Sequence, residues 1–409
     1  MTMGGDAAPH ARPRRKRSIG EIFLVSLRLG LTSFGGPIAH LGYFRDEYVH
    51  RRKWLDDQTY ADLVALCQFT PGAASSKVGI GVGLSMGGIP GAIAAWLGFT
   101  LPSALALILF AFGVTAYSDL FDSGFLHGLK VVAVAVVALA VWGMAKTLCP
   151  DPPRATLAIG AALVFSMWPT SLGQIGAIAA GGLIGFVFLK DKRAINPVPM
   201  HTGIGRPAGA LALSLFFVLL IGLPALSALG PDQPLALFDR FYRAGSLVFG
   251  GGHVVLPLLQ SEVVQPGWVT NDTFLAGYGA AQAVPGPLFT FAAYLGAVLG
   301  PEPNGIAGAA IALLAVFLPG FLILVGILPF WDTFRRHAWA QSAMQGANAA
   351  VVGILAAALY SPVFTSAVTN LREFVLALGC FVLLMAWKSP PWLVVIVAAI
   401  GGAGLALIT

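Results

Sequence analysis

The chain has 409 residues, of which 57% are hydrophobic and only 10% are charged. Soluble domains carry about a quarter charged residues, so most of this surface must face lipid or other helices, which excludes a soluble globular protein. The net charge of +6 is modest and gathers at 12–17, 51–53 and 190–193. Such clusters are typical of loops at an anionic cytoplasmic leaflet and do not indicate a face that binds nucleic acid.

In chain order, the predicted elements are those of an all-α, polytopic protein of the inner (plasma) membrane. Residues 1–17 form a basic cytoplasmic N-terminus without a cleavage site, so the first segment is expected to stay uncleaved. Two helical segments interrupted by glycine and proline follow at 19–44 and 59–85. Apolar runs that can cross, or largely cross, a bilayer lie at 88–116, 131–144 with its apolar flanks, 208–229, 305–330 and 347–359.

The sequence contains an internal duplication. Residues 28–72 align on 243–286 with one single-residue gap and share about a dozen identities, where unrelated sequence of this composition should give roughly three. We therefore divide the chain into a first repeat at 18–190, a linker with one connecting transmembrane span at 191–234, and a second repeat at 235–409.

Corresponding loops of the two repeats carry opposite charge. Residues 45–53 contain Arg45, Arg51, Arg52 and Lys53, whereas the matching stretch 260–268 has no basic residue. A later pair shows the reverse pattern, because 117–127 is acidic and 331–342 contains two arginines. Since basic loops favour the cytoplasm, and the single span in the linker reverses the second repeat, we predict an inverted-topology repeat. A parallel duplication whose loop charges drifted is the alternative.

Each repeat contains two predicted helix breaks, a Phe-Gly-Gly and a Pro-Gly. Proline removes a backbone donor and glycine loosens the turn, so broken or re-entrant helices are expected to meet near the membrane midplane. Their free amides and positive dipole ends are suited to an anion. The predicted substrate-binding residues at and beside the breaks are Gly35, Gly36, Pro37, Gln68, Pro71, Gly72, Gly250, Gly251, Gly252, Gln282, Pro285 and Gly286.

Charged side chains inside apolar segments are the other candidates. Arg28 and Arg243 precede the Phe-Gly-Gly breaks at matched positions. A guanidinium suits a tetrahedral oxyanion, so we interpret both as substrate ligands, with snorkelling to the headgroups or a structural ion pair as the alternative. Lys77, after the Pro71-Gly72 break, is a second-tier anion ligand.

Three acidic residues could carry a coupling proton or ion. Glu47 and Glu262 are matched between the repeats, whereas Asp62 has no partner in the second repeat. Structural pairing is the preferred interpretation for all three. We expect no cofactor, because the three cysteines lack metal-ligand spacing and the sequence has no ATP-binding or hydrolase motif. An ion gradient or a partner protein remains as the energy source, and we expect no enzyme.

The run 30–40, followed by Trp54-Leu55 and 68–72, resembles the chromate ion transporter family. The second copy and the Leu-Pro pairs at 101–102 and 318–319 fit as well. The resemblance implies two homologous halves in the inner membrane and export of chromate, which confers chromate resistance, with sulfate as the isosteric competitor. One departure is that the usual Pro-Gly-Pro is Pro71-Gly72-Ala73 in the first repeat, whereas Pro285-Gly286-Pro287 keeps it.

Two other functions stay open from the sequence. A passive anion channel would conduct down the anion's own electrochemical gradient, and a sulfate uptake transporter would use the same fold for the opposite direction. The sequence does not determine the oligomeric state.

Overall fold

The computed structural model describes residues 17–116, 123–189, 204–230, 232–249, 252–331 and 337–407. Within these ranges the chain forms helices and turns and no strand. Five of the described helices are long and apolar enough to cross a membrane, among them Arg206–Ser227 in the predicted linker. The expectation of a helical, multi-pass membrane protein is thereby confirmed.

Two helical pairs open the first half, and the predicted breaks separate their members. Helix α1 (Ile19–Thr32) begins at Ser18, whose hydroxyl accepts from the Glu21 amide, and α2 (Gly36–Arg45) runs into the π-helical turn η1 (Asp46–Arg51). Helix α3 (Asp57–Phe69) precedes α4 (Ala74–Ala116). Within α4, Gly88 has a φ of 65°, which kinks the helix there.

Three more helices complete the first half, and the second half repeats the order of the first. The first half ends with α5 (Ser123–Leu148), α6 (Pro152–Met167) and α7 (Ser171–Phe188), and α8 (Arg206–Ser227) leads to the second half. The second half contains α9 (Gln233–Ser246), η2 (Gly252–Val254), α10 (Val255–Val263), α11 (Asn271–Ala281), η3 (Leu288–Thr290), α12 (Phe291–Val298), α13 (Gly305–Ile327), η4 (Leu328–Phe330), α15 (Ala338–Ala358), η5 (Leu359–Phe364), α16 (Thr365–Ala367), α17 (Leu371–Met385) and α18 (Pro391–Ala406).

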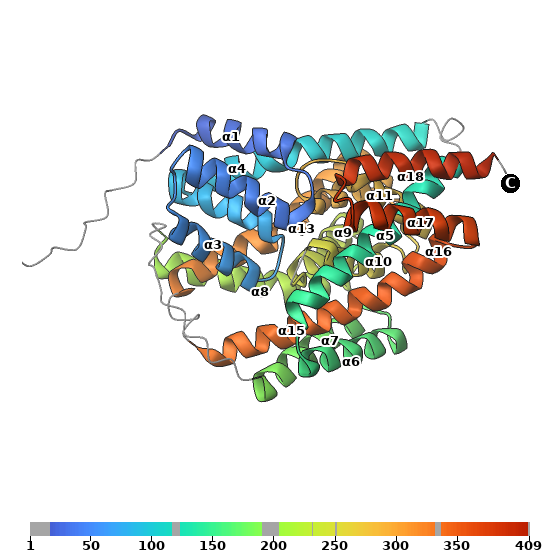
Figure 1. The fold of residues 1–409 in the computed structure, drawn as a ribbon. Coiled ribbons are helices and arrows are strands. Elements are labelled where there is room, and N and C mark those ends of the chain that lie inside the picture. Colours follow the sequence, from blue (N-terminus) through green and yellow to red (C-terminus); the bar gives the residue numbers. More distant parts are fainter. Residues whose placement is uncertain are drawn as a thin grey trace, which may run out of the picture.

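The two halves interlock instead of folding side by side. Helix α5 packs against α17 and α18 of the second half, and its counterpart α15 packs against α6 and α7 of the first half (Figure 1). Within the halves, α1 packs on α4 just as α9 packs on α13. Equivalent contacts made in both directions are what a two-fold axis between the halves produces.

The inverted orientation stays a prediction, because a two-fold axis relates the halves whether it lies in the membrane plane or along its normal. The oppositely charged loops at 45–53 and 260–268 are in the described part of the chain. Residues 117–122 and 332–336, which carry the charges of the second loop pair, lie outside it, as do the N-terminal residues 1–16.

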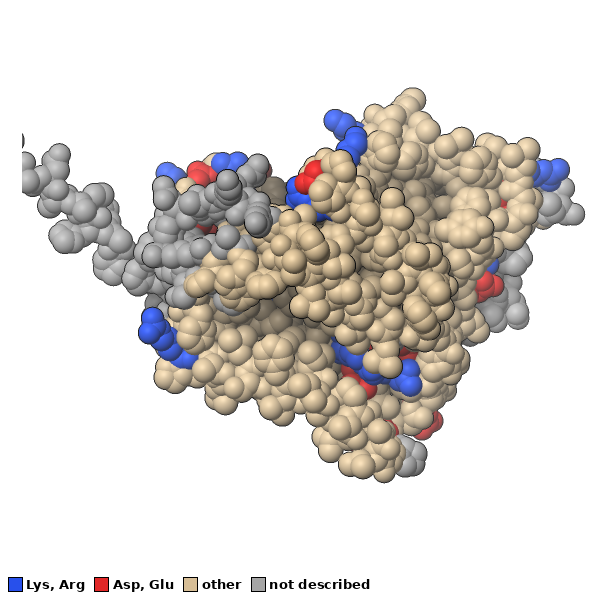
Figure 2. Space-filling model, turned by 90° about the horizontal axis from the view of Figure 1, so that it is seen from below, with Lys and Arg blue, Asp and Glu red and all other residues tan. Residues whose placement is uncertain are grey.

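The surface agrees with immersion in lipid. Charged side chains form a few small groups, and broad uncharged stretches separate them (Figure 2). Leu109, Leu172 and Leu229 are among many large apolar side chains that are exposed. Contiguous exposed apolar surface on this scale is expected for a membrane-facing protein.

Candidate functional site

The helix breaks of both halves meet at one place, which we call the junction and define by Ser33, Gly72, Val248 and Gly286. The Gly72 amide donates to the Val248 carbonyl at 2.8 Å, and the Gly286 amide donates to the Ser33 carbonyl at 2.9 Å. Ser33 aligns with Val248, and Gly72 aligns with Gly286, so the two bonds are the same bond made in opposite directions. Each Pro-Gly break is therefore fixed to the Phe-Gly-Gly break of the other half.

Two equivalent residues also contact each other at the junction. A Cβ built on Gly252 would lie 3.1 Å from Cγ of Pro37, the residue with which Gly252 aligns. Contact between equivalent positions places this point close to the pseudo-two-fold axis. Gly250 and Gly251 lie outside the described residues, so the structure does not test their predicted role.

The Pro-Gly breaks need glycine for two reasons. Gly72 and Gly286 have φ values of 102° and 103°, which L-residues rarely adopt. A Cβ on Gly72 would also lie 2.9 Å from the Gly320 Cα, and a Cβ on Gly286 would lie 2.9 Å from the Ser103 hydroxyl oxygen. Since Ser103 aligns with Gly320, both halves use the same close approach.

Buried polar groups lie around the first half of the junction, among them His40, for which the sequence favours a satisfied polar contact over carriage of a coupling proton. Nδ1 of His40 forms a hydrogen bond of 3.3 Å with the Ser75 hydroxyl, in which either group can be the donor. The His40 ring packs edge-on against Phe99. Within the described residues, four buried polar atoms have no hydrogen-bond partner here: Ser33 Oγ, His40 Nε2, Ser76 Oγ and Thr100 Oγ1. Small hydroxyl residues directly beside the breaks, such as Ser33 and Ser75-Ser76, were the available sequence signal.

Lys77 lies inside the protein with 1% of its surface exposed. Its Nζ donates to the Thr70 carbonyl at 2.6 Å, the Thr70 hydroxyl at 2.7 Å and the Pro71 carbonyl at 2.8 Å. An ammonium has three donors, so in this conformation no proton remains for an anion. The lysine instead holds the end of α3 and the first Pro-Gly break.

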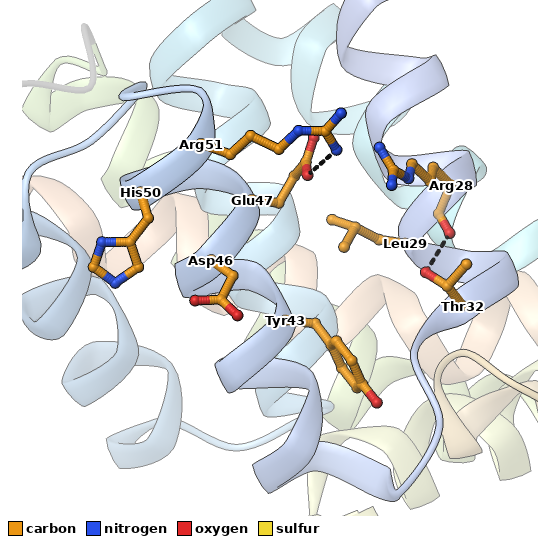
Figure 3. Close-up of a pocket in the computed structure, with 8 residues that line it drawn as sticks. All are labelled: Arg28, Leu29, Thr32, Tyr43, Asp46, Glu47, His50 and Arg51. Carbon is orange, nitrogen blue, oxygen red and sulfur yellow. Dashed lines mark hydrogen bonds and ion pairs between the residues drawn. The ribbon is translucent and has the colours of Figure 1, made fainter.

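Arg28 borders a cavity of about 460 Å³ between α1 and the facing segment α2–η1 (Figure 3). Residues from both sides line the cavity, namely Arg28, Leu29, Thr32, Tyr43, Asp46, Glu47, His50 and Arg51. The Arg28 side chain is exposed, and its guanidinium makes no ion pair within the described part of the chain. The cavity lining includes none of the break glycines, so Arg28 stands apart from the junction in this conformation.

Glu47, in the same cavity, is already paired. Burial opposes its ionisation, but hydrogen bonds from Arg52 at 2.6 Å and Arg51 at 3.0 Å outweigh that effect and hold the pKa of Glu47 below its ordinary value. This geometry agrees with the structural interpretation of Glu47.

Arg243 is held differently from its counterpart Arg28. It donates to Asp239 at 2.7 Å and lies 3.4 Å from the Glu262 carboxylate, and both acids are 5% exposed. Arg240 donates to the Glu262 backbone carbonyl at 2.7 Å and stacks over Trp268. The second arginine thus belongs to a closed ion-pair network, whereas the first faces an open cavity.

The structure does not gather the remaining predicted residues into one place. Gln68 is exposed, Gln282 is half-buried, and Asp62 is buried on α3 with a polar partner. Pro71 and Pro285 lie within the breaks as predicted. No group of three or more metal-ligating side chains occurs among the described residues.

The chain is similar in sequence to a known protein family and to several of its relatives. The model of the family described as Chromate transporter matches residues 20–186 and 235–403, one region in each half. A chromate transport protein of Pseudomonas aeruginosa is 28% identical over 98% of this chain and 94% of its own length. A chromate transport protein of Cupriavidus metallidurans is 24% identical over 94% and 92%.

A third relative, an uncharacterized transporter of Methanocaldococcus jannaschii, is 28% identical over 84% of both chains. No solved structure matches. The family model covers most of the chain, and its two matched regions coincide with the two halves that have the same order of helices. The chain therefore belongs to the chromate transporter family.

Proposed function

We propose that this protein is a secondary transporter that exports chromate across the inner membrane and thereby confers chromate resistance. The observation that carries the proposal is the junction, where the breaks of both halves meet beside buried polar atoms that lack partners. Buried hydroxyl and imidazole groups without partners are costly, and a tetrahedral oxyanion offers acceptors to satisfy them. Similarity to chromate transport proteins along nearly the whole chain supports the same substrate.

The binding site of the proposal combines the junction with the two arginines. The backbone at Gly35 and Gly36 lies at a helix break, where amide groups are available to an anion. The Gly72 and Gly286 amides already donate across the junction, so in the proposal these two glycines shape the site and do not donate to the anion. Arg28 would attract the anion into its cavity, and the junction would complete the site. In an inverted repeat, rocking of one half against the other would expose this junction alternately to the two sides.

The asymmetry between the arginines supports alternating access. Arg28 faces an open cavity, whereas Arg243 is closed off by Asp239 and Glu262. One open half and one closed half are expected of a single conformer of such a transporter. The opposite conformer would close around Arg28 and release Arg243.

Export of a dianion needs no coupling proton. The membrane potential does work of about 2.3 kcal/mol per unit charge per 100 mV, so a dianion leaving a negative interior gains about 4.6 kcal/mol. At about 1.36 kcal/mol per factor of ten, this maintains a gradient of more than about a thousandfold. The potential is therefore a sufficient energy source for the proposed export.

The test is chromate uptake into everted membrane vesicles, whose interior becomes positive during respiration. We expect uptake that exceeds empty-vector vesicles, that excess sulfate inhibits, and that a protonophore abolishes. No uptake by protein shown to be in the membrane would refute the chromate assignment. Uptake of sulfate into right-side-out vesicles, without uptake of chromate into everted ones, would favour a sulfate importer.

A second measurement separates a carrier from a passive anion channel. Unlabelled chromate loaded inside the vesicles should accelerate uptake of labelled chromate, because a loaded carrier returns faster than an empty one. A channel would show no such acceleration.

A further inference from the structure

Lys77 is a buried lysine whose Nζ donates to three acceptors, which requires the three protons of the charged ammonium form. Its three acceptors are two backbone carbonyls and one hydroxyl, and no carboxylate lies within ion-pair distance in the described part of the chain. The titratable side chain that faces it is Cys67, from α3. Neutral oxygens solvate an ammonium but do not cancel its charge, and an ionisable group at such a depth is usually retained for a function.

The position of Lys77 relates it to the junction. The Cγ and Cδ atoms lie 3.6 and 3.7 Å from a Cβ built on Gly320, and Cδ lies 3.8 Å from one built on Gly72. The lysine stem therefore packs at the point where the first break meets α13 of the second half. The equivalent position in the second half is Phe291, so this charge exists once in the molecule.

The two Pro-Gly breaks have the same conformation but different residues. Gly72 and Gly286 have φ values of 102° and 103°. Proline at 287 restricts the chain after Gly286, with a φ of −73°, whereas Ala73 follows Gly72. The hydrogen bonds of Lys77 to Thr70 and Pro71 restrain the first break, where this proline is missing.

We propose that Lys77 is a specificity-determining residue that restrains the first break and leaves an uncompensated positive charge beside the junction, which favours doubly charged over singly charged oxyanions. The proposal rests on the proposed function, since it concerns the same site. Because all three donors of Nζ are occupied, the charge acts through space and the lysine does not contact the anion in this conformation.

Coulomb's law gives this proposal a quantitative signature. The interaction energy scales with the anion's charge, so removal of the lysine charge weakens dianion binding by the square of the factor that it costs a monoanion. At any one separation, a loss of about tenfold for a monoanion therefore corresponds to a loss of about a hundredfold for a dianion. A purely structural defect would weaken both anions by similar factors.

The experiment compares four purified proteins: wild type, Lys77→Met, the double variant Ala73→Pro/Lys77→Met, and Lys146→Met. Methionine keeps the length of the lysine stem without its charge, and Ala73→Pro restores the proline at the first break. Lys146 is an exposed lysine that stacks on Trp142, so its variant controls for loss of one surface charge. Binding of sulfate and of perrhenate, a tetrahedral monoanion, is measured by tryptophan fluorescence, and chromate uptake is measured in proteoliposomes.

We expect Lys77→Met to be less stable than wild type. Its factor of loss in sulfate affinity should be the square of its factor of loss in perrhenate affinity. The double variant should regain much of the stability but keep the unequal losses, and Lys146→Met should bind both anions as wild type does. Equal losses for the two anions, or wild-type sulfate affinity in the double variant, would overturn the charge role. Should Lys77→Met not fold, the double variant and Lys77→Gln decide the question by the same ratio.

The proposed function fails separately. Wild type that binds sulfate but carries no chromate would refute chromate export, while unequal losses in Lys77→Met would still support the selectivity role. Normal chromate uptake in wild type, combined with equal losses, would refute only the inference on Lys77.

Discussion

Gly72→Ala should destabilise the protein for two separate reasons, backbone strain and overpacking. The native φ of 102° at Gly72 costs an alanine at least the roughly 1–2 kcal/mol of a left-handed conformation. The new Cβ would also lie 2.9 Å from the Gly320 Cα. Because that neighbour is backbone, no side chain can rotate away, and overpacking of this kind costs about 1–3 kcal/mol. We therefore expect a loss of about 2–5 kcal/mol in the free energy of unfolding.

Two other glycines in the same region provide matched controls. Gly36 has a φ of 76° but no atom within 4 Å of a built Cβ, so Gly36→Ala should cost only the conformational part, about 1–2 kcal/mol. Gly42 is helical and equally uncrowded. Gly42→Ala should be neutral or stabilising by up to about 1 kcal/mol.

The assay is the unfolding free energy of the purified variants in mixed micelles, followed by circular dichroism as denaturing detergent is added. The predicted order of stability is Gly42→Ala above Gly36→Ala above Gly72→Ala. A Gly72→Ala protein as stable as Gly36→Ala would show that the close approach of the two halves is not present in solution. Equal stability of all three would refute both parts of the reasoning.

Two further predictions concern the charged residues. Arg28→Ala should reduce chromate uptake and leave thermal stability nearly unchanged. Arg243→Ala should also destabilise by about 1–3 kcal/mol, because the buried Asp239 carboxylate loses its ion pair with Arg243. Thermal unfolding of both variants checks this, and equal stability losses would contradict it. Glu47 has a lowered native pKa, so its stabilisation is present above the ordinary glutamate pKa and is lost as the pH falls through the native value. The difference in thermal stability between wild type and Glu47→Gln should accordingly be constant near neutral pH and vanish in acid, and a difference that persists in acid would contradict the assignment.

The helix breaks could be predicted from sequence because their causes are local. Glycine and proline act on their own turn, and α1 and α3 end at Thr32 and Phe69, directly before the predicted breaks. Apolar runs likewise predicted α8 and α13 to within a few residues. The role of a single glycine could not be predicted in this way, because Gly88 stands among several similar glycines in the sequence. Gly88 has a φ of 65° and kinks α4, whereas Gly83 permits close packing against Gly91.

The junction could not be predicted in the same way. Its hydrogen bonds join residues that are more than a hundred positions apart in the chain, and Ser33 and Val248 contribute only their carbonyls. A backbone acceptor leaves no signature in residue type, so a sequence pattern cannot show which break faces which. The duplication does supply one constraint, since any contact between the halves has to occur in both directions if a two-fold axis relates them.

Aligned residues can still differ in function when their neighbours have diverged. Arg28 and Arg243 are identical, but Asp239, which pairs with Arg243, aligns with Leu24. Duplication therefore predicts where the backbone breaks, whereas the unmatched residues determine which charges are free. The asymmetry cannot set the direction of net flux, because the electrochemical gradient alone sets it. It can set which conformer is populated at rest, since an ion pair made in only one state shifts the equilibrium by its differential free energy. In the proposed mechanism, the pairs of Arg243 with Asp239 and Glu262 would stabilise the conformer in which the cavity beside Arg28 is open.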